Sequence, residues 1–292
     1  MRRALISFPM FGENFVIDPP YAVNIGSFPV YLYGMVIALG LLLAVLYTSR
    51  YHRRLDISMD EVYDLLIFAL PTAIVFARLY YVVFNFDLYR DDLLGILRIR
   101  DGGLAIYGGV IGAVLALYLR CRHQKIGFGK ALDVAAFGLL IGQSVGRWGN
   151  FFNREAYGYE TDIFCRMGLS WNGETIYVHP TFLYESLWNF AGLLLLHNIC
   201  RKHRRYQGQF FLLYVAWYGL GRTMIEGLRT DSLWLIPELI RVSQLLAVVS
   251  CLAAVTVYLI NHRRLAQGRN PLWGGSLDGD VTMKAEEGSE SR

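Results

Sequence analysis

The sequence predicts an all-α polytopic membrane protein with about seven transmembrane helices, and three observations support this. The 292 residues are 54% hydrophobic and only 18% charged, whereas soluble domains carry about a quarter charged residues. Seven stretches approach the roughly 20 mostly apolar residues that a membrane-spanning helix needs. The loops between these stretches alternate between many and few basic residues. The seven stretches are residues 29–48, 62–84, 104–119, 131–150, 181–199, 208–227 and 240–261.

Basic residues determine the expected orientation. Clusters of arginine and lysine follow the first, third, fifth and seventh stretches, and 16 of the 28 basic residues fall on that side of the membrane. The positive-inside rule therefore puts the C-terminus in the cytoplasm and the N-terminus outside, although Arg2 and Arg3 run against it. Residues 1–265 form the expected seven-helix membrane domain, with the outer loop 151–180 as a small cap. Residues 266–292 are polar and aperiodic, and we expect a disordered cytoplasmic tail.

The start of the chain, MRRALISFPMFGENF, has basic residues followed by apolar ones, as signal peptides do. Pro9 and Gly12 interrupt the apolar run before it reaches the length of a signal-peptide core. We therefore expect a short interfacial segment here.

The stretch from Gly142 to Gly158, GQSVGRWGNFFNREAYG, begins in an apolar run and ends in polar residues. Gly138, Gly142 and Gly146 recur every fourth residue, which on a helix makes a flat track for a neighbouring helix. An ionised group near the hydrocarbon core costs about 2.5–3.5 kcal/mol even on lenient insertion scales, so it needs a partner, a cavity or a ligand. The polar residues that follow the track are Arg147, Asn150, Asn153, Arg154 and Glu155.

The sixth stretch carries a second polar face. Tyr218, Arg222, Glu226 and Arg229 are spaced i, i+4, i+8 and i+11, which places them on one side of a helix. One interpretation is an Arg222–Glu226 ion pair that only fastens helices together. Because paired intramembrane charges are often partly structural, the stripe alone does not indicate a ligand.

Arg147 favours a ligand, because a second arginine on a different stretch leaves an excess of positive charge. Guanidinium groups match phosphate oxygens with two parallel hydrogen bonds and stay protonated when desolvated. We therefore expect an anionic lipid headgroup near Arg147 and Arg222. Asn150 and Asn153 are either additional donors to it or helix caps.

Further polar residues accompany these arginines. Tyr31 and Tyr33 open the first stretch, where interfacial tyrosines commonly form an aromatic belt. Arg78 belongs either to a polar cluster beside the site or to ordinary helix contacts. Tyr107 lies in the run DGGLAIYGGVIG, which predicts either a loop followed by close helix packing or a re-entrant lip. Glu185, about a turn into the fifth stretch, is a candidate partner for one of the arginines.

Several motifs, in order, resemble one known family. GRWGNFFNREAYG is similar to the signature of the prolipoprotein diacylglyceryl transferases, and HPTFLYE, YGLGRTMIEGLR, ARLYYV and the early LYG resemble its other blocks. The resemblance runs from about Pro29 to Gln244. It implies a multi-pass enzyme of the bacterial cytoplasmic (inner) membrane. Such an enzyme moves the diacylglyceryl group of phosphatidylglycerol to the lipobox cysteine of a prolipoprotein signal peptide, giving a thioether and glycerol 1-phosphate.

The resemblance also implies roles for individual residues. Arg147 and Arg222 would bind the phosphate, with Tyr33 and Arg78 as supporting polar residues. The residues that would complete the site are Tyr218, Glu226, Asn150, Asn153, Glu155 and Gly158. The reaction requires no cofactor and no metal, and we expect no nucleic-acid partner.

One position departs from the family pattern. Some members have a histidine before the double glycine, where this chain has Tyr107. A tyrosine with an ordinary pKa of about 10 is a poor base, so Tyr107 would position the headgroup or the thiol through its hydroxyl. The general base stays open between Glu226 and Glu155.

Two other classes of function remain. A transporter or channel for an anionic solute would use the same arginines, but it predicts charges near the membrane midplane and internal duplication, and we find no internal repeat. A structural or lipid-binding membrane protein would keep the Arg222–Glu226 pair only as a contact between helices, replaceable by apolar residues.

Overall fold

The computed structural model describes residues 4–12, 15–26, 28–99, 102–236, 239–275 and 277. It is mostly helical, and each of the seven stretches expected to form a helix does so, with ends that differ by a few residues. The helices are α1 (Leu32–Tyr51), α2 (Met59–Phe84), α3 (Ile106–Gln124), α4 (Phe128–Asn153), α5 (Thr181–Lys202), α6 (Gln209–Glu226) and α7 (Val242–Ala266).

Four helices are long and apolar enough to cross a membrane, judged by length and composition in the described part of the chain. They are α1 with the 3-10 turn η2 (His52–Leu55) that follows it, α2, α4 and α7. α6 carries Arg222 and Glu226 within only 18 residues, which lowers its mean hydropathy. The prediction of an all-α fold holds for the bulk of the chain only, because the N-terminal segment and the loop after α4 form β-strands.

The chain divides into two compact units. The first contains α1, most of α4, the helices α5, α6 and α7, and the strands. The second contains α2, α3, the start of α4 and the turn Tyr206–Gly208.

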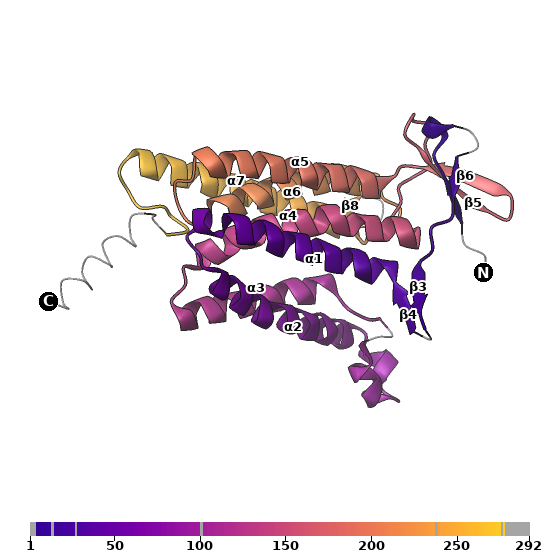
Figure 1. Cartoon of the computed structure of the whole chain (residues 1–292), viewed down its shortest axis with the longest axis horizontal. Helices are drawn as coiled ribbons and strands as arrows, with labels where there is room; N and C mark the ends of the chain where they lie inside the picture. Colours follow the sequence, from indigo (N-terminus) through magenta and orange to yellow (C-terminus); the bar gives the residue numbers. More distant parts are fainter. Residues whose placement is uncertain are drawn as a thin grey trace. The chain divides into compact units, whose positions relative to one another are not determined.

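Within the first unit, α1, α4, α5, α6 and α7 run side by side (Figure 1). The glycine track predicted on α4 is confirmed, because α1 packs along it. A Cβ atom on Gly40 of α1 would lie 3.4 Å from the Cα of Gly142, and one on Gly146 would lie 3.2 Å from Ile37. Small residues thus let the two backbones approach closely, which holds the polar end of α4 beside the start of α1.

Paired hydrogen bonds join the next helices. Ser144 of α4 and Ser186 of α5 each donate to the other's backbone carbonyl, at 2.9 and 2.8 Å. Trp188 of α5 and Trp217 of α6 do the same at 2.9 Å through their indole N–H groups, and their rings stack 4.4 Å apart. These contacts fix α4, α5 and α6 against one another, so the polar groups on them have defined positions.

A four-stranded antiparallel sheet lies beyond one end of these helices (Figure 1), with the order β2-β1-β5-β6. Its core packs Ile6 and Leu169 against Phe151 at the end of α4 and Phe182 at the start of α5. The N-terminal segment, expected only at an interface, therefore supplies two strands. The strands are β1 (Leu5–Ser7), β2 (Val16–Ile17), β5 (Met167–Trp171) and β6 (Glu174–Val178).

The hairpin between β5 and β6 turns through Asn172 and Gly173, both with positive φ (52° and 94°). Asn-Gly is the preferred pair for a two-residue turn that matches the twist of the flanking strands. This local signal accounts for a hairpin inside the 151–180 loop.

The remaining short elements flank the helices. The strand pairs are β3 (Ala22–Ile25) with β4 (Phe28–Tyr31) and β7 (Trp234–Ile236) with β8 (Ile240–Arg241). The 3-10 helices are η1 (Pro9–Phe11), η3 (Phe86–Tyr89) and η4 (Leu93–Leu97), besides η2.

In the second unit, α2 begins with a capping box in which Ser58 and Glu61 bind each other's backbone N–H, at 3.2 and 2.6 Å. α3 packs closely on α2, since a Cβ on Gly108 would lie 2.4 Å from the carbonyl oxygen of Phe76. From Gly102 onward, the run DGGLAIYGGVIG is therefore a loop followed by a tightly packed helix.

The expected tail begins with residues that fold back on α7. Asn261 accepts hydrogen bonds from the backbone N–H groups of Leu272 and Trp273 and donates to the Trp273 carbonyl at 2.8 Å. Residues 278–292, the greater part of the expected disordered tail, lie outside the described residues.

Candidate functional site

The site is built around Glu185, near the start of α5, whose side chain is 4% exposed. Its carboxylate forms an ion pair with Arg147 of α4 through Oε2. Its Oε1 accepts hydrogen bonds from Arg222 of α6 at 3.0 Å and from Arg229, just beyond α6, at 3.2 Å. Three guanidinium groups from separate places in the sequence therefore meet on one buried carboxylate.

Two more acidic residues complete the charge balance. Glu226, one turn after Arg222 on α6, places Oε2 2.6 Å from Nη2 of Arg222. The oxygen lies off the N–H direction, so this is an ion pair without a hydrogen bond. Asp231 binds Arg229 with two parallel hydrogen bonds of 2.9 and 2.7 Å. The three arginines thus face the three carboxylates of Glu185, Glu226 and Asp231.

The Arg229–Asp231 pair lies in the loop after α6, and the two groups perturb each other. Burial acts to lower the pKa of Arg229, but the hydrogen bond to Asp231 and the nearby charge of Glu185 outweigh it and raise the pKa. The hydrogen bond from Arg229 lowers the pKa of Asp231, against its partial burial. Both groups therefore stay charged at neutral pH.

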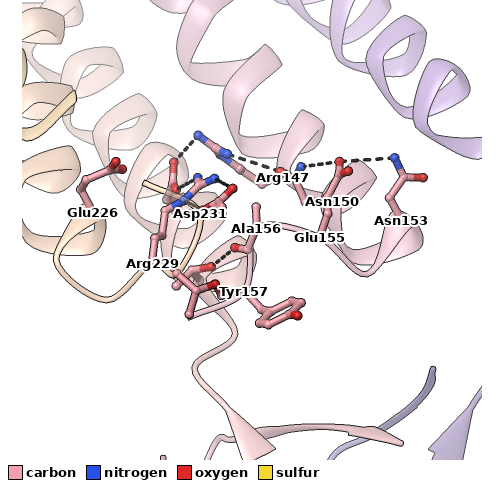
Figure 2. Close-up of polar contacts among 12 residues, drawn as sticks. Arg147, Asn150, Asn153, Glu155, Ala156, Tyr157, Glu226, Arg229 and Asp231 are labelled. Atoms are coloured by element: carbon pink, nitrogen blue, oxygen red, sulfur yellow. Dashed lines mark hydrogen bonds and ion pairs between the residues drawn. The ribbon is translucent and has the colours of Figure 1, made fainter. Parts of the chain in front are cut away.

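A row of polar contacts continues from Arg147 past the end of α4. Arg147 donates to Asn150 at 3.3 Å, and Asn150 and Asn153 donate to the same oxygen of Glu155 at 2.9 and 3.3 Å. Figure 2 shows these four side chains in one row, with Arg229 and Asp231 beside Arg147. Glu155 is exposed, whereas Glu226 is fully buried. Glu226 is therefore the desolvated one of the two candidate bases.

A strained turn directs this row. Arg154, immediately after α4, has a φ of 53°, a left-handed conformation that is uncommon for residues other than glycine. Its guanidinium donates hydrogen bonds to the carbonyls of Ala4 and Phe152, at 3.0 and 2.7 Å, and to the carboxylate of Asp18 at 2.7 Å. These bonds offset the cost of the left-handed backbone conformation. Arg154 thus ties the sheet to the end of α4, and the turn brings Glu155 back to Asn150.

Gly158 allows the loop after α4 to approach the loop after α6. Its N–H donates to the His179 carbonyl at 3.0 Å, and it forms an antiparallel bridge with Arg229. A Cβ atom here would lie 2.7 Å both from the carbonyl oxygen of Leu228 and from the Cβ of His179. Only glycine fits this position, and the bridge fixes the backbone of Arg229.

The chain is similar to known proteins over most of its length. A family model described as prolipoprotein diacylglyceryl transferase matches residues 20–260. Proteins named phosphatidylglycerol--prolipoprotein diacylglyceryl transferase from Bacillus cereus (strain B4264), Bacillus anthracis (strain CDC 684 / NRRL 3495) and Bacillus mycoides (strain KBAB4) are each 43% identical over 254 residues, which is 84% of this chain and 93% of the relative. The chain belongs to the prolipoprotein diacylglyceryl transferase family.

Most of the residues that the family signature singles out lie in one contact network. Arg147, Arg222 and Glu226 join it through ion pairs, and Gly158 joins it through its bridge to Arg229. Asn150, Asn153 and Glu155 extend it along the row after Arg147. A simple Arg222–Glu226 pair is therefore not an adequate description of the sixth helix, because Arg222 is shared with Glu185.

The two tyrosines of the first unit lie next to this network. The ring of Tyr33 on α1 packs against α4, where a Cβ on Gly149 would lie 2.6 Å from it. Tyr218 on α6 stacks on Tyr214, with ring centroids 5.8 Å apart. Among the residues that the structure describes, no ion pair or hydrogen bond connects Tyr218 to the arginines, so its place in the site stays a prediction.

Arg78 and Tyr107 belong to the second unit, so the structure neither adds them to the arginine network nor separates them from it. Arg78 is buried and donates to five backbone carbonyls of residues 95–103, at 2.7 to 3.3 Å. A guanidinium has five N–H donors, and this set occupies them. The geometry thus favours a role in holding the loop before α3 over direct contact with a headgroup.

Sequence reasoning underestimated Glu185, Arg229 and Asp231. The sequence indicates Glu185 only as a candidate partner for one of the arginines, and Arg229 only as the last member of a helical stripe. The usable signal was charge balance, because three arginines near an apolar core need acidic partners. The choice of partner required the positions of α4, α5 and α6.

Proposed function

We propose that this protein transfers the diacylglyceryl group of phosphatidylglycerol to the lipobox cysteine of prolipoproteins. The products would be a thioether-linked lipid on the cysteine and glycerol 1-phosphate. Family membership and the names of relatives at 43% identity support the reaction. The observation that carries the proposal at the level of the site is the convergence of Arg147, Arg222 and Arg229 on one carboxylate.

These arginines suit a phosphodiester headgroup. A guanidinium binds two phosphate oxygens with parallel charge-assisted hydrogen bonds, and it remains protonated when desolvated. Arg147 lies on α4 and Arg222 on α6. The Ser144–Ser186 contacts join α4 to α5, and the Trp188–Trp217 contacts join α5 to α6, so the donors of both arginines are preorganised. Preorganised positive charge next to the leaving group is usually the largest contribution to catalysis of this type.

The chemistry balances without any further reactant. The thiol loses its proton to a base, and its sulfur forms a bond to the glyceryl carbon that carries the phosphate. The bond between that carbon and the phosphate oxygen breaks, and the phosphate gains one negative charge as it leaves. The arginines oppose that added charge. Glu226 is the better candidate for the base, since it is buried while Glu155 is exposed.

We place the enzyme in the bacterial cytoplasmic membrane with all seven helices spanning it, the N-terminus outside and the C-terminus in the cytoplasm. Four helices qualify as spans by composition, and the basic loops support this orientation. In this placement the site faces the outer leaflet, and the hairpin β5–β6 caps it. Deleting residues 160–177 should abolish turnover, and a deletion variant with wild-type turnover would contradict the cap. Accessibility of single cysteines placed in the loops would test the orientation.

The site does not favour a transporter. Arg147 lies near the end of α4, and Arg222 lies in the last turns of α6, whereas solute sites of transporters commonly lie near the midplane. The deciding experiment is a mass-spectrometric assay of purified protein with phosphatidylglycerol micelles and a lipobox peptide. We expect a diacylglyceryl mass increase on the peptide cysteine. A well-folded protein that produces none, beside a working relative, would refute the proposed function.

A further inference from the structure

Glu185 has a property that a catalytic acid or base does not require: it takes hydrogen bonds or ion pairs from all three arginines of the site at once. Arg147 binds Oε2, while Arg222 and Arg229 bind Oε1 at 3.0 and 3.2 Å. A carboxylate offers about four acceptor positions, so Glu185 is close to saturated. By contrast, Glu226 and Asp231 each form an ion pair with one arginine among the described residues.

A carboxylate and a phosphodiester present similar groups to a guanidinium. Each carries one negative charge over two oxygens, and each accepts parallel hydrogen bonds from an arginine. The donors that would bind the phosphate are thus the ones that Glu185 uses. A phosphate that is to bind Arg147 and Arg222 with both of its oxygens must compete with Glu185 for their N–H groups.

Charge gives the same result independently. The three guanidinium groups are balanced by the carboxylates of Glu185, Glu226 and Asp231. A phosphate that entered while all three carboxylates kept their contacts would add a fourth negative charge in a poorly solvated site, which is unfavourable. The repulsion is smallest if the carboxylate nearest all three arginines moves away from them.

We propose that Glu185 is an internal competitor for the phosphate, displaced from the arginines when the lipid headgroup binds and returning to them as glycerol 1-phosphate leaves. This inference rests on the proposed function and specifies how its phosphate site is emptied and refilled. The return matters for turnover, because the product carries more negative charge than the substrate and would otherwise be held tightly by three arginines. Glu185 is therefore a positioning residue that acts through the arginines.

The test measures binding separately from turnover. Purified wild type and Glu185→Gln, in a neutral detergent, are titrated calorimetrically with dihexanoyl-phosphatidylglycerol and with glycerol 1-phosphate. Glutamine keeps the shape of the side chain but not its charge. We expect both ligands to bind Glu185→Gln at least about tenfold more tightly, since a charged competitor for charge-assisted hydrogen bonds is gone. In turnover, KM and kcat should fall together, and glycerol 1-phosphate should inhibit more strongly.

Asp231→Asn is the matched control, because it removes one negative charge from the same network but frees only Arg229. The affinity of Asp231→Asn for both ligands should differ from that of wild type by less than about threefold. An equal increase in affinity in Glu185→Gln and Asp231→Asn would show a general effect of charge and would overturn the proposal. Unchanged or weaker binding by Glu185→Gln would do the same, and that is what a purely structural Glu185 predicts.

Loss of a buried counter-ion can prevent folding, so Glu185→Asp provides a second measurement. It keeps the charge but draws the carboxylate back by one methylene, and it should bind the lipid severalfold more tightly than wild type. Equal affinity would contradict the displacement. If wild type transfers no diacylglyceryl group but Glu185→Gln still gains affinity, the proposed function fails alone. If wild type is active and no gain is seen, the displacement fails alone.

Discussion

Arg147 of α4 and Glu185 of α5 form an ion pair in which the Glu185 side chain is 4% exposed. Removing one partner of a buried pair leaves an uncompensated charge, which typically costs about 3–5 kcal/mol. The pair persists because α4 and α5 are fastened through Ser144 and Ser186, and because Arg222 and Arg229 share the same carboxylate.

Replacing Arg147 should abolish transfer. We expect Arg147→Ala to lower kcat/KM by at least about 100-fold, as loss of one preorganised donor to a developing charge typically does. Arg147→Lys should recover little, because an ammonium group cannot bind two oxygens in parallel. The mass-spectrometric assay measures both. Arg90→Ala, at a well-exposed arginine that pairs with the exposed Asp87, is the control, and wild-type activity in Arg147→Ala would contradict the phosphate site.

Arg154 should matter for stability and not for chemistry. Its guanidinium holds the carbonyls of Ala4 and Phe152 and the carboxylate of Asp18. Arg154→Ala should lower the thermal unfolding midpoint in detergent, since several hydrogen bonds to a charged donor are lost at about 1.5–3 kcal/mol each. The exposed Arg263 gives the control variant Arg263→Ala. A change in kcat for the folded fraction, with an unchanged midpoint, would contradict this role.

Gly158→Ala should impair the site through its backbone. The added methyl would lie 2.7 Å from the Leu228 carbonyl oxygen and would push the chain before Arg229 away. Overpacking of this kind costs about 1–3 kcal/mol, so we expect kcat/KM to fall by roughly tenfold or more. Gly34→Ala is the control, because nothing lies within 4 Å of its added Cβ. Equal activity of the two variants would show that the close approach at Gly158 has no functional role.

His179 should make stability depend on pH. Burial lowers the pKa of His179, so the unfolded chain, with a histidine pKa near 6.5, binds the proton more tightly than the folded protein. The stabilising contribution is present above about pH 6.5 and is lost as the pH falls towards the lower folded pKa. The unfolding midpoint of wild type should therefore fall more than that of His179→Gln between about pH 7 and about pH 5.5. An equal fall of the unfolding midpoint in wild type and in His179→Gln would contradict this role of His179.

The helices and the polar candidates could be read from the sequence, because both are local signals. Apolar runs of the right length predicted all seven helices, and a glycine at every fourth position predicted the face of α4 that α1 covers. Arg147 and Arg222 were recognisable because charge in an apolar run is costly. The Asn172–Gly173 pair is an equally local signal for the hairpin between β5 and β6.

Only the tertiary structure decided which charges meet and where the first strands lie. Glu185 lies on α5, whereas its three arginines lie on α4, on α6 and just beyond α6. No spacing along the chain therefore identifies it as their common partner. β1 pairs with β5 although more than half of the chain separates them, and three residues have no periodicity to reveal a strand. Local pattern determines an element, whereas the choice of neighbours depends on how helices and strands pack.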